Sequence, residues 1–148
     1  MKRVIAVATV VAAVAMPATA GAGPAADQSF SGSSKRGVLS VDFTVYKLGN
    51  KPVGVDNFKV QNLEMECNED PAAELDFKLK IKGDEFFKVN DKKRFRAVSN
   101  KGPRTLKVTG EFVTNNKVEG KVKAEGRFDG GALTGCFGTA PYEGQTQA

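Results

Sequence analysis

Six acidic side chains gather in one short stretch of the sequence, with no basic residue among them: Glu64, Glu66, Glu69, Asp70, Glu74 and Asp76. If the strands on either side of residues 68–71 form a hairpin, four of these carboxylates project from its outer face, namely Glu64, Glu66, Glu74 and Asp76. Facing carboxylates repel one another unless a cation lies between them. The four are therefore candidates for a weak calcium site or a general acid–base pair. The alternative is a solvated strand face beside an acidic turn, because the spacing lacks the Asp/Asn ligands and glycine of calcium loops.

The opposite charge dominates the segment that follows. Residues 78–107 hold eleven basic and three acidic side chains, including a basic turn at 92–96. A concentrated basic surface attracts polyanions, here an anionic surface polymer such as a wall polymer or an acidic glycan. Nucleic acid is not expected, since no row of exposed aromatics accompanies the arginines to stack bases. The alternative is solubility and edge protection, because Lys78, Lys80 and Lys82 fall on outward positions of one strand.

Familiar catalytic motifs are missing from the 148 residues. The chain has no histidine, which excludes a His-based triad and an imidazole metal site. The polar run at 29–34 lacks the Gly-x-Ser-x-Gly spacing of a serine nucleophile, and no glycine-rich phosphate loop precedes a helix. We therefore predict no catalytic residue and no cofactor.

The two cysteines, Cys67 and Cys136, are predicted to form one structural disulfide. They stand 69 positions apart, whereas a redox-active pair needs a close motif such as Cys-x-x-Cys. An exported chain with an even number of cysteines is normally oxidised. Closing so long a loop stabilises a small domain by about 4 kcal/mol.

The elements that must position these residues are strands. Apolar residues alternate with polar ones in four stretches, near 39–45, 73–81, 106–112 and 118–128, and turn-forming residues separate them. Period-2 alternation is typical of antiparallel sheets with one face on a core. We predict an all-β single domain of about eight or nine short antiparallel strands, a coiled barrel or a closely related sandwich.

Two local features refine this prediction. In the segment 53–67, Phe58 and Val60 are out of phase with Leu63, Met65 and Cys67, which indicates either a β-bulge near residues 61–62 or two short strands with a bend. Glycines inside the later strands, at 110, 120, 126 and 135, indicate tight curvature or aromatic rings lying over bare backbone.

The N-terminus reads as a secretion signal. A cationic start is followed by thirteen uncharged residues at 4–16, Pro17 and a small-x-small cleavage pattern, which predicts a signal peptide at 1–20 with an alternative cut after Ala22. The expected organisation is then a flexible lead-in at 21–28, a β domain at 29–142 and a tail at 143–148. Removal of residues 1–20 lowers the net charge from +5 to +3. The expected product is secreted and monomeric, with no membrane span after cleavage.

The aromatic residues leave two functional interpretations open. Phe43, Phe77, Phe112 and Phe128 occupy inward positions, where they either fill a core or line a pocket for an apolar small molecule. We predict a non-catalytic binding or surface-interaction domain. The first alternative is a small β-barrel that carries an apolar ligand, and the second is a carboxylate-based enzyme.

Three short motifs carry a family resemblance: the segment from Phe58-Lys59-Val60 to Cys67, the Gly110-Glu111-Phe112 hairpin with Asn115-Asn116-Lys117-Val118-x-Gly120, and Gly135-Cys136-x-Gly138-Thr139. Over about residues 30–142 the layout resembles a group of small, secreted, β-rich proteins from high-GC Gram-positive bacteria. Such proteins often end with an aromatic residue, a place that Tyr142 takes. The resemblance implies the fold and export, and it implies no activity.

Overall fold

The computed structural model describes residues 25–35, 37–81 and 85–147. The predicted signal peptide, both of its cleavage sites and Lys82 lie outside these residues. The described chain forms nine strands and one short 3-10 turn: β1 (Ala25–Ser33), β2 (Ser40–Leu48), β3 (Lys51–Met65), β4 (Ala73–Leu79), β5 (Phe87–Lys88), β6 (Arg94–Lys101), β7 (Arg104–Thr114), β8 (Lys117–Phe128), η1 (Asp129–Gly131) and β9 (Leu133–Thr146).

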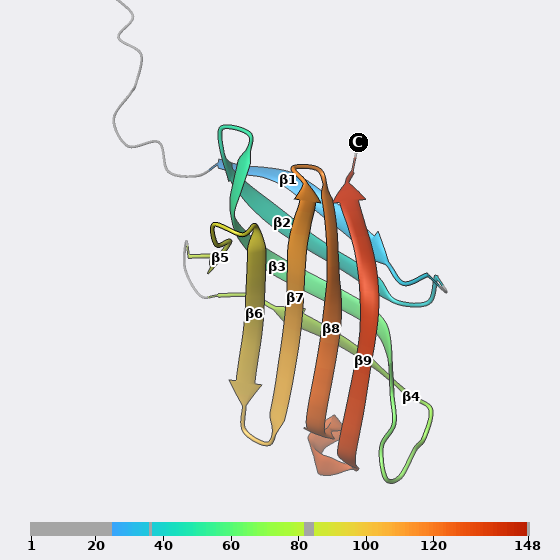
Figure 1. Ribbon diagram of the computed structural model, residues 1–148. Helices are drawn as coiled ribbons and strands as arrows, with labels where there is room; N and C mark the ends of the chain where they lie inside the picture. Colours follow the sequence, from blue (N-terminus) through green and yellow to red (C-terminus); the bar gives the residue numbers. More distant parts are fainter. Residues whose placement is uncertain (1–24, 36, 82–84, 148) are drawn as a thin grey trace, which may run out of the picture.

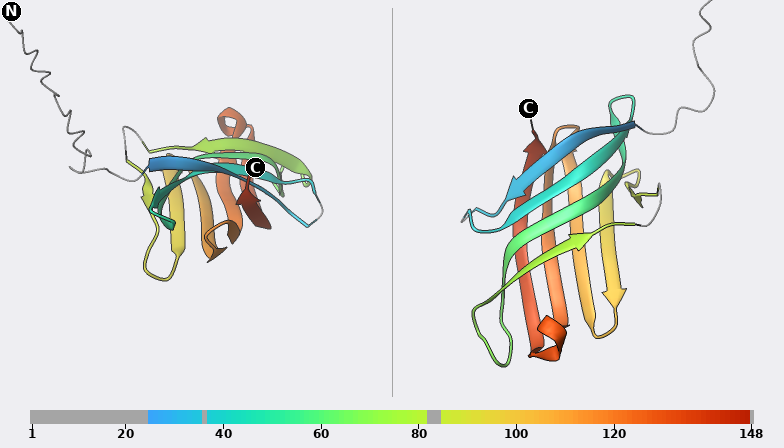
Figure 2. Two further views of the ribbon diagram at one scale, coloured as in Figure 1. Left: turned by 90° about the horizontal axis from the view of Figure 1, so that it is seen from above. Right: turned by 180° about the vertical axis from the view of Figure 1, so that it is seen from behind.

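The strands make one antiparallel sheet that curls into a half-barrel. The order is β4-β3-β2-β1-β9-β8-β7-β6. The short strand β5 pairs with Gly54 and Val55 of β3, ahead of the part of β3 that pairs with β4. Strands β6–β9 form the front layer in Figure 1, and β1–β4 cross behind them. The two layers are continuous where β1 pairs with β9, and both views in Figure 2 show the sheet folding back on itself there. The all-β, antiparallel prediction is therefore confirmed.

Phenylalanine rings fill the space between the two layers. Most of the inward positions predicted from alternation are buried, including Val41, Val45, Val108 and Val122 at 0% exposure, whereas Leu75, Phe77 and Ile81 are only partly buried. Ring centroids lie 5.4 Å apart for Phe30 and Phe43, 5.2 Å for Phe43 and Phe58, 5.8 Å for Phe58 and Phe95, and 5.9 Å for Phe95 and Phe112. Separations of this size are those of rings in direct contact. The interior at these rings is packed.

A β-bulge sets the phase of β3, as one of the two sequence interpretations predicted. The pairing of β3 with β4 shifts register between Val60 and Leu63, and Asn62 has a φ of 59°. The Asn62 N–H donates to a carboxylate oxygen of Asp76 at 2.8 Å, which holds the bulged backbone. The extra residue returns Leu63 and the apolar positions after it to the core face.

Two strand glycines make room for aromatic rings. A β-carbon at Gly110 would lie 2.4 Å from the Phe95 ring, and one at Gly120 would lie 2.8 Å from the Tyr142 ring. Across Gly120 the Tyr142 hydroxyl reaches β7, where it donates to the Thr109 carbonyl oxygen at 3.1 Å. Rings over bare backbone are thus one reason for glycines inside these strands.

The ends of the β domain extend beyond the predicted boundaries. The lead-in predicted at 21–28 is wrong from Ala25 onward, because β1 begins there opposite Lys47 of β2. The tail predicted from residue 143 is wrong up to Thr146, which pairs with Phe30. Neither end alternates strongly in sequence; Ala25 is held by main-chain pairing with β2, and Thr146 by pairing with β1.

A covalent link closes the side of the half-barrel where β3 ends and β9 begins. The sulfur atoms of Cys67 and Cys136 lie 2.06 Å apart, at disulfide distance. Beside them Glu66 and Phe137 exchange two main-chain hydrogen bonds, each 2.9 Å long. None of the helical segments in the described residues has the length and hydrophobicity needed to cross a membrane.

Candidate functional site

The four candidate carboxylates lie on open surface. Glu64 stands directly opposite Glu74 in the β3–β4 hairpin, as the hairpin hypothesis required. Glu66 and Asp76 are also exposed, and Asp76 is engaged by the bulge. Within the described ranges, no three acidic, histidine or cysteine side chains gather in a way that could hold a metal ion. A carboxylate pair for acid–base chemistry works in a cleft, whereas these four side chains lie on an open strand face.

A fifth acidic residue, Glu69, is hydrogen-bonded to Thr134, a residue far along the chain. Thr134 of β9 donates its N–H to one Glu69 oxygen at 2.7 Å and its hydroxyl to the other. These two hydrogen bonds, the hydroxyl first, hold the pKa of the Glu69 carboxyl below its ordinary value of 4.5. Glu69 therefore ties the acidic turn to the start of β9, close to the disulfide.

The basic run of the sequence is divided between several strands. Lys78 is exposed on β4, an edge strand of the sheet, and Lys80 is exposed just after the end of that strand, so both stand where lysine discourages edge-to-edge association. Lys88 lies on β5, and Arg94 and Arg96 lie on the opposite edge strand, β6.

A compact basic surface forms on the outer side of the front layer, facing the viewer in Figure 1. In the register of β6, β7 and β8, Arg96 pairs with Thr109, and Thr109 pairs with Lys121. In the adjacent row of the same face, Lys107 pairs with Lys123. We call Arg96, Lys107, Lys121 and Lys123 the basic face. Cross-strand neighbours have Cα atoms about 5 Å apart, so Thr109 lies between Arg96 and Lys121, with Lys107 next to it on the same face of β7.

Three ion pairs neutralise the surroundings of the basic face but leave most of it uncompensated. Arg94 pairs with Glu111 at 2.9 Å, Lys117 with Glu119 at 3.6 Å, and Lys123 with Glu125 at 3.3 Å. Across the part of the chain that the structure describes, no carboxylate lies within ion-pairing distance of Arg96, Lys107 or Lys121. Lysines directly opposite each other, such as Lys107 and Lys123, repel, and an anion bound between them would relieve this repulsion.

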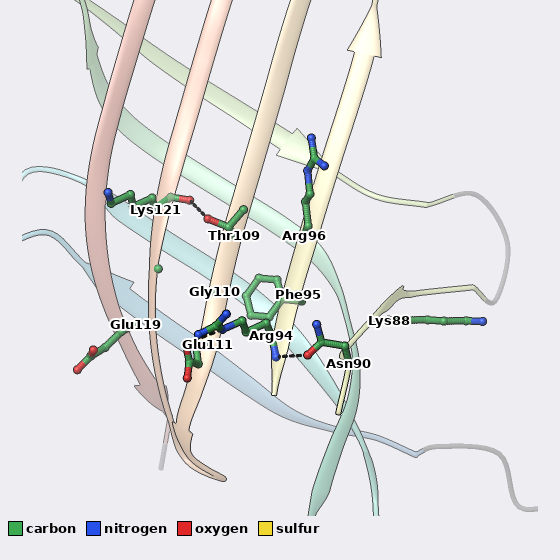
Figure 3. Close-up of a pocket in the computed structure, with 11 residues that line it drawn as sticks. Lys88, Asn90, Arg94, Phe95, Arg96, Thr109, Gly110, Glu111, Glu119 and Lys121 are labelled. Carbon is green, nitrogen blue, oxygen red and sulfur yellow. Dashed lines mark hydrogen bonds and ion pairs between the residues drawn. The ribbon is translucent and has the colours of Figure 1, made fainter. Parts of the chain in front are cut away.

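A shallow groove of about 660 Å³ borders the basic face (Figure 3). Its floor is the backbone row of Phe95, Gly110 and Gly120, which pair with one another across β6, β7 and β8. One wall carries Glu111 and Glu119, with Arg94 drawn against Glu111 in the figure. The opposite wall carries Arg96, Thr109 and Lys121. The acidic wall therefore limits the basic face on one side.

Half of the basic face was missed by sequence reasoning. Lys121 and Lys123 stand in β8, outside the basic run at 78–107, and they join it only through the pairing of β7 with β8. The signal was present, because the inward positions Val118 and Val122 place both lysines outward. To place these lysines beside the basic run, however, the register of the β7–β8 hairpin is needed, because it sets Lys123 opposite Lys107.

Comparison of the chain with protein-family models, with curated proteins and with solved structures found no match in any of the three.

Proposed function

We propose that this protein is a secreted, non-catalytic binding domain that holds an anionic surface polymer on its basic face. The observation that carries the proposal is the placement of Arg96, Lys107 and Lys121 around Thr109 with no carboxylate of the described chain paired to them. Such a surface attracts a polyanion by releasing its counterions. A shallow groove on an open sheet face suits a long polymer better than a small molecule, which needs an enclosed concave site.

The packed interior favours this function over the carriage of an apolar ligand. A carrier needs an enclosed space, and at the centre of this molecule the Phe43 ring contacts the rings of Phe30 and Phe58. Both neighbours are almost completely buried. The binding surface is therefore sought on the outside of the sheet.

Salt-dependent binding of a soluble polyanion tests the proposal. We expect the secreted protein to bind polygalacturonate and inorganic polyphosphate, with an affinity that falls steeply as salt concentration rises. The double variant Arg96→Gln/Lys121→Gln should lower the slope of log affinity against log salt by about two, one for each contact removed. Isothermal titration calorimetry across a salt series gives both quantities.

The matched control is Lys51→Gln/Lys80→Gln. It removes the same total charge from the first residue of β3 and from the residue that follows β4, both away from the basic face. We expect this control to retain the affinity and most of the salt slope. Equal losses in the two double variants would mean that net charge alone drives binding, and the basic face would then have no special role.

A further inference from the structure

An exposed aromatic ring lies beside the basic face. Phe137 of β9 is 48% exposed, although most phenylalanines of the described chain are buried. It follows Cys136, whose side chain points inward to the disulfide, so the Phe137 ring stands on the outer surface. The Lys123 ammonium lies 5.5 Å from the centre of this ring, which places a cation of the basic face against the aromatic surface.

The backbone of Phe137 is held on both sides. It pairs with Glu125 of β8 on one side and exchanges two 2.9 Å hydrogen bonds with Glu66 on the other. The disulfide at the preceding residue fixes the same point to the end of β3. A ring on so constrained a backbone loses little conformational freedom when it binds a ligand.

The ring and three of the cations lie on one oblique line across the front layer. Arg96 of β6 is one row from Lys107 of β7, Lys107 stands opposite Lys123 of β8, and Phe137 of β9 is one row further on. The Lys107–Lys123 step joins directly opposite residues, whose Cα atoms lie about 5 Å apart, and the other two steps are diagonal, at about 7–8 Å. The line therefore runs from three cations to one exposed aromatic ring.

We propose that the polymer held on the basic face is an acidic polysaccharide with a carboxylate on each sugar, which crosses β6 to β9 and stacks one sugar on Phe137. This inference rests on the proposed function and adds the chemical class of the ligand. The C–H face of a sugar packs against an aromatic ring, while the carboxylates of neighbouring sugars meet Arg96 and Lys107, since Lys123 already pairs with Glu125. Polyphosphate has the charge but no sugar ring to stack. Comparison of the two polymers therefore separates the contribution of charge from that of stacking on Phe137.

The variant Phe137→Ala tests the inference, with Phe137→Leu as an apolar side chain that lacks the ring. We expect both variants to bind polygalacturonate about three- to tenfold more weakly, the range expected for loss of one aromatic contact. Their affinity for polyphosphate should change less than twofold. The matched control is Val113→Ala, since Val113 is 51% exposed but lies near the β7–β8 turn, away from the line. Its affinity for both polymers should equal that of the unaltered protein.

The outcomes distinguish the two proposals. Equal losses for both polymers in Phe137→Leu, or no loss for either, would overturn the polysaccharide assignment and leave the basic face as a general polyanion site. If Arg96→Gln/Lys121→Gln binds both polymers as well as the unaltered protein does, the proposed function itself is wrong. Circular dichroism and denaturant midpoints of each variant show whether a loss of binding comes from a loss of folded protein.

Discussion

At the scale of single residues, Gly120 connects the interior of the molecule to its outer face. Its missing side chain lets the Tyr142 ring cross β8 and reach the Thr109 carbonyl on β7. The Thr109 side chain lies on the other side of that strand, between Arg96 and Lys121 of the basic face. The position of Thr109, which lies between two cations of the basic face, therefore depends on a hydrogen bond made in the core.

Substitution Gly120→Ala should destabilise the protein by about 1–3 kcal/mol, the usual cost of an added carbon in a packed site. The new β-carbon would lie 2.0 Å from the Thr109 carbonyl oxygen and 2.8 Å from the Tyr142 ring, so backbone and ring must both shift. Guanidinium unfolding measures the change. The control Gly144→Ala places its β-carbon no closer than 3.5 Å to any neighbour, and a similar loss there would refute the steric explanation.

At the scale of elements, β3 shows how one residue sets the phase of the second half of a strand. It is the longest strand of the described chain, at 15 residues, and it pairs with β2, β4 and β5. Its bulge at Asn62 keeps both halves of the strand on the core face. The second half ends at the disulfide, so the phase of β3 also determines whether Cys67 faces Cys136.

Deletion of Asn62 should prevent the disulfide from forming. A one-residue change of phase turns every later inward side chain of the strand outward, because the side-chain period of a strand is two. Leu63 and Met65 would then face solvent. We expect two free thiols per molecule in a thiol assay under non-reducing conditions, and poor recovery of folded protein. Deletion of Asn50 in the β2–β3 turn is the control, and full oxidation of both deletion variants would contradict the prediction.

The bulge could be predicted from sequence because it leaves a local mark, the change of phase between Val60 and Leu63. The extent of β1 and β9 could not, since Ala25 and Thr146 are strand residues through main-chain pairing with distant partners. The candidate site could likewise be predicted from the sequence only in part. The basic run at 78–107 was visible in the sequence, whereas the Lys107–Lys123 pair and the proximity of Phe137 to Lys123 depend on register between strands.

At the scale of the whole molecule, the two layers are joined at several places. The β1–β9 pairing forms the seam, the disulfide and the Glu66–Phe137 bridge join β3 to β9, and Thr134 binds Glu69. Phenylalanines of both layers share one core. Neither layer can separate without exposing the apolar face of the other, so we expect unfolding to be a single cooperative transition.

The buried phenol of Tyr142 makes that transition visible in ultraviolet light. The protein has no tryptophan and two tyrosines, so the phenolate absorbance comes from few groups. Burial raises the pKa of the Tyr142 phenol above its ordinary value of 10. The stability this provides is complete below pH 10 and is lost as the pH rises through the folded-state pKa, because the unfolded chain ionises first.

In an alkaline titration, the Tyr142 phenolate should therefore appear together with the loss of the far-ultraviolet β-sheet signal. Subtraction of the absorbance of the variant Tyr142→Phe from that of the unaltered protein gives the part that comes from the Tyr142 phenolate. Ionisation of Tyr142 in a protein whose sheet signal is intact would show that the ring is reached by solvent without unfolding. If the two signals change together, the ultraviolet absorbance of the Tyr142 phenolate serves as an optical readout of global unfolding.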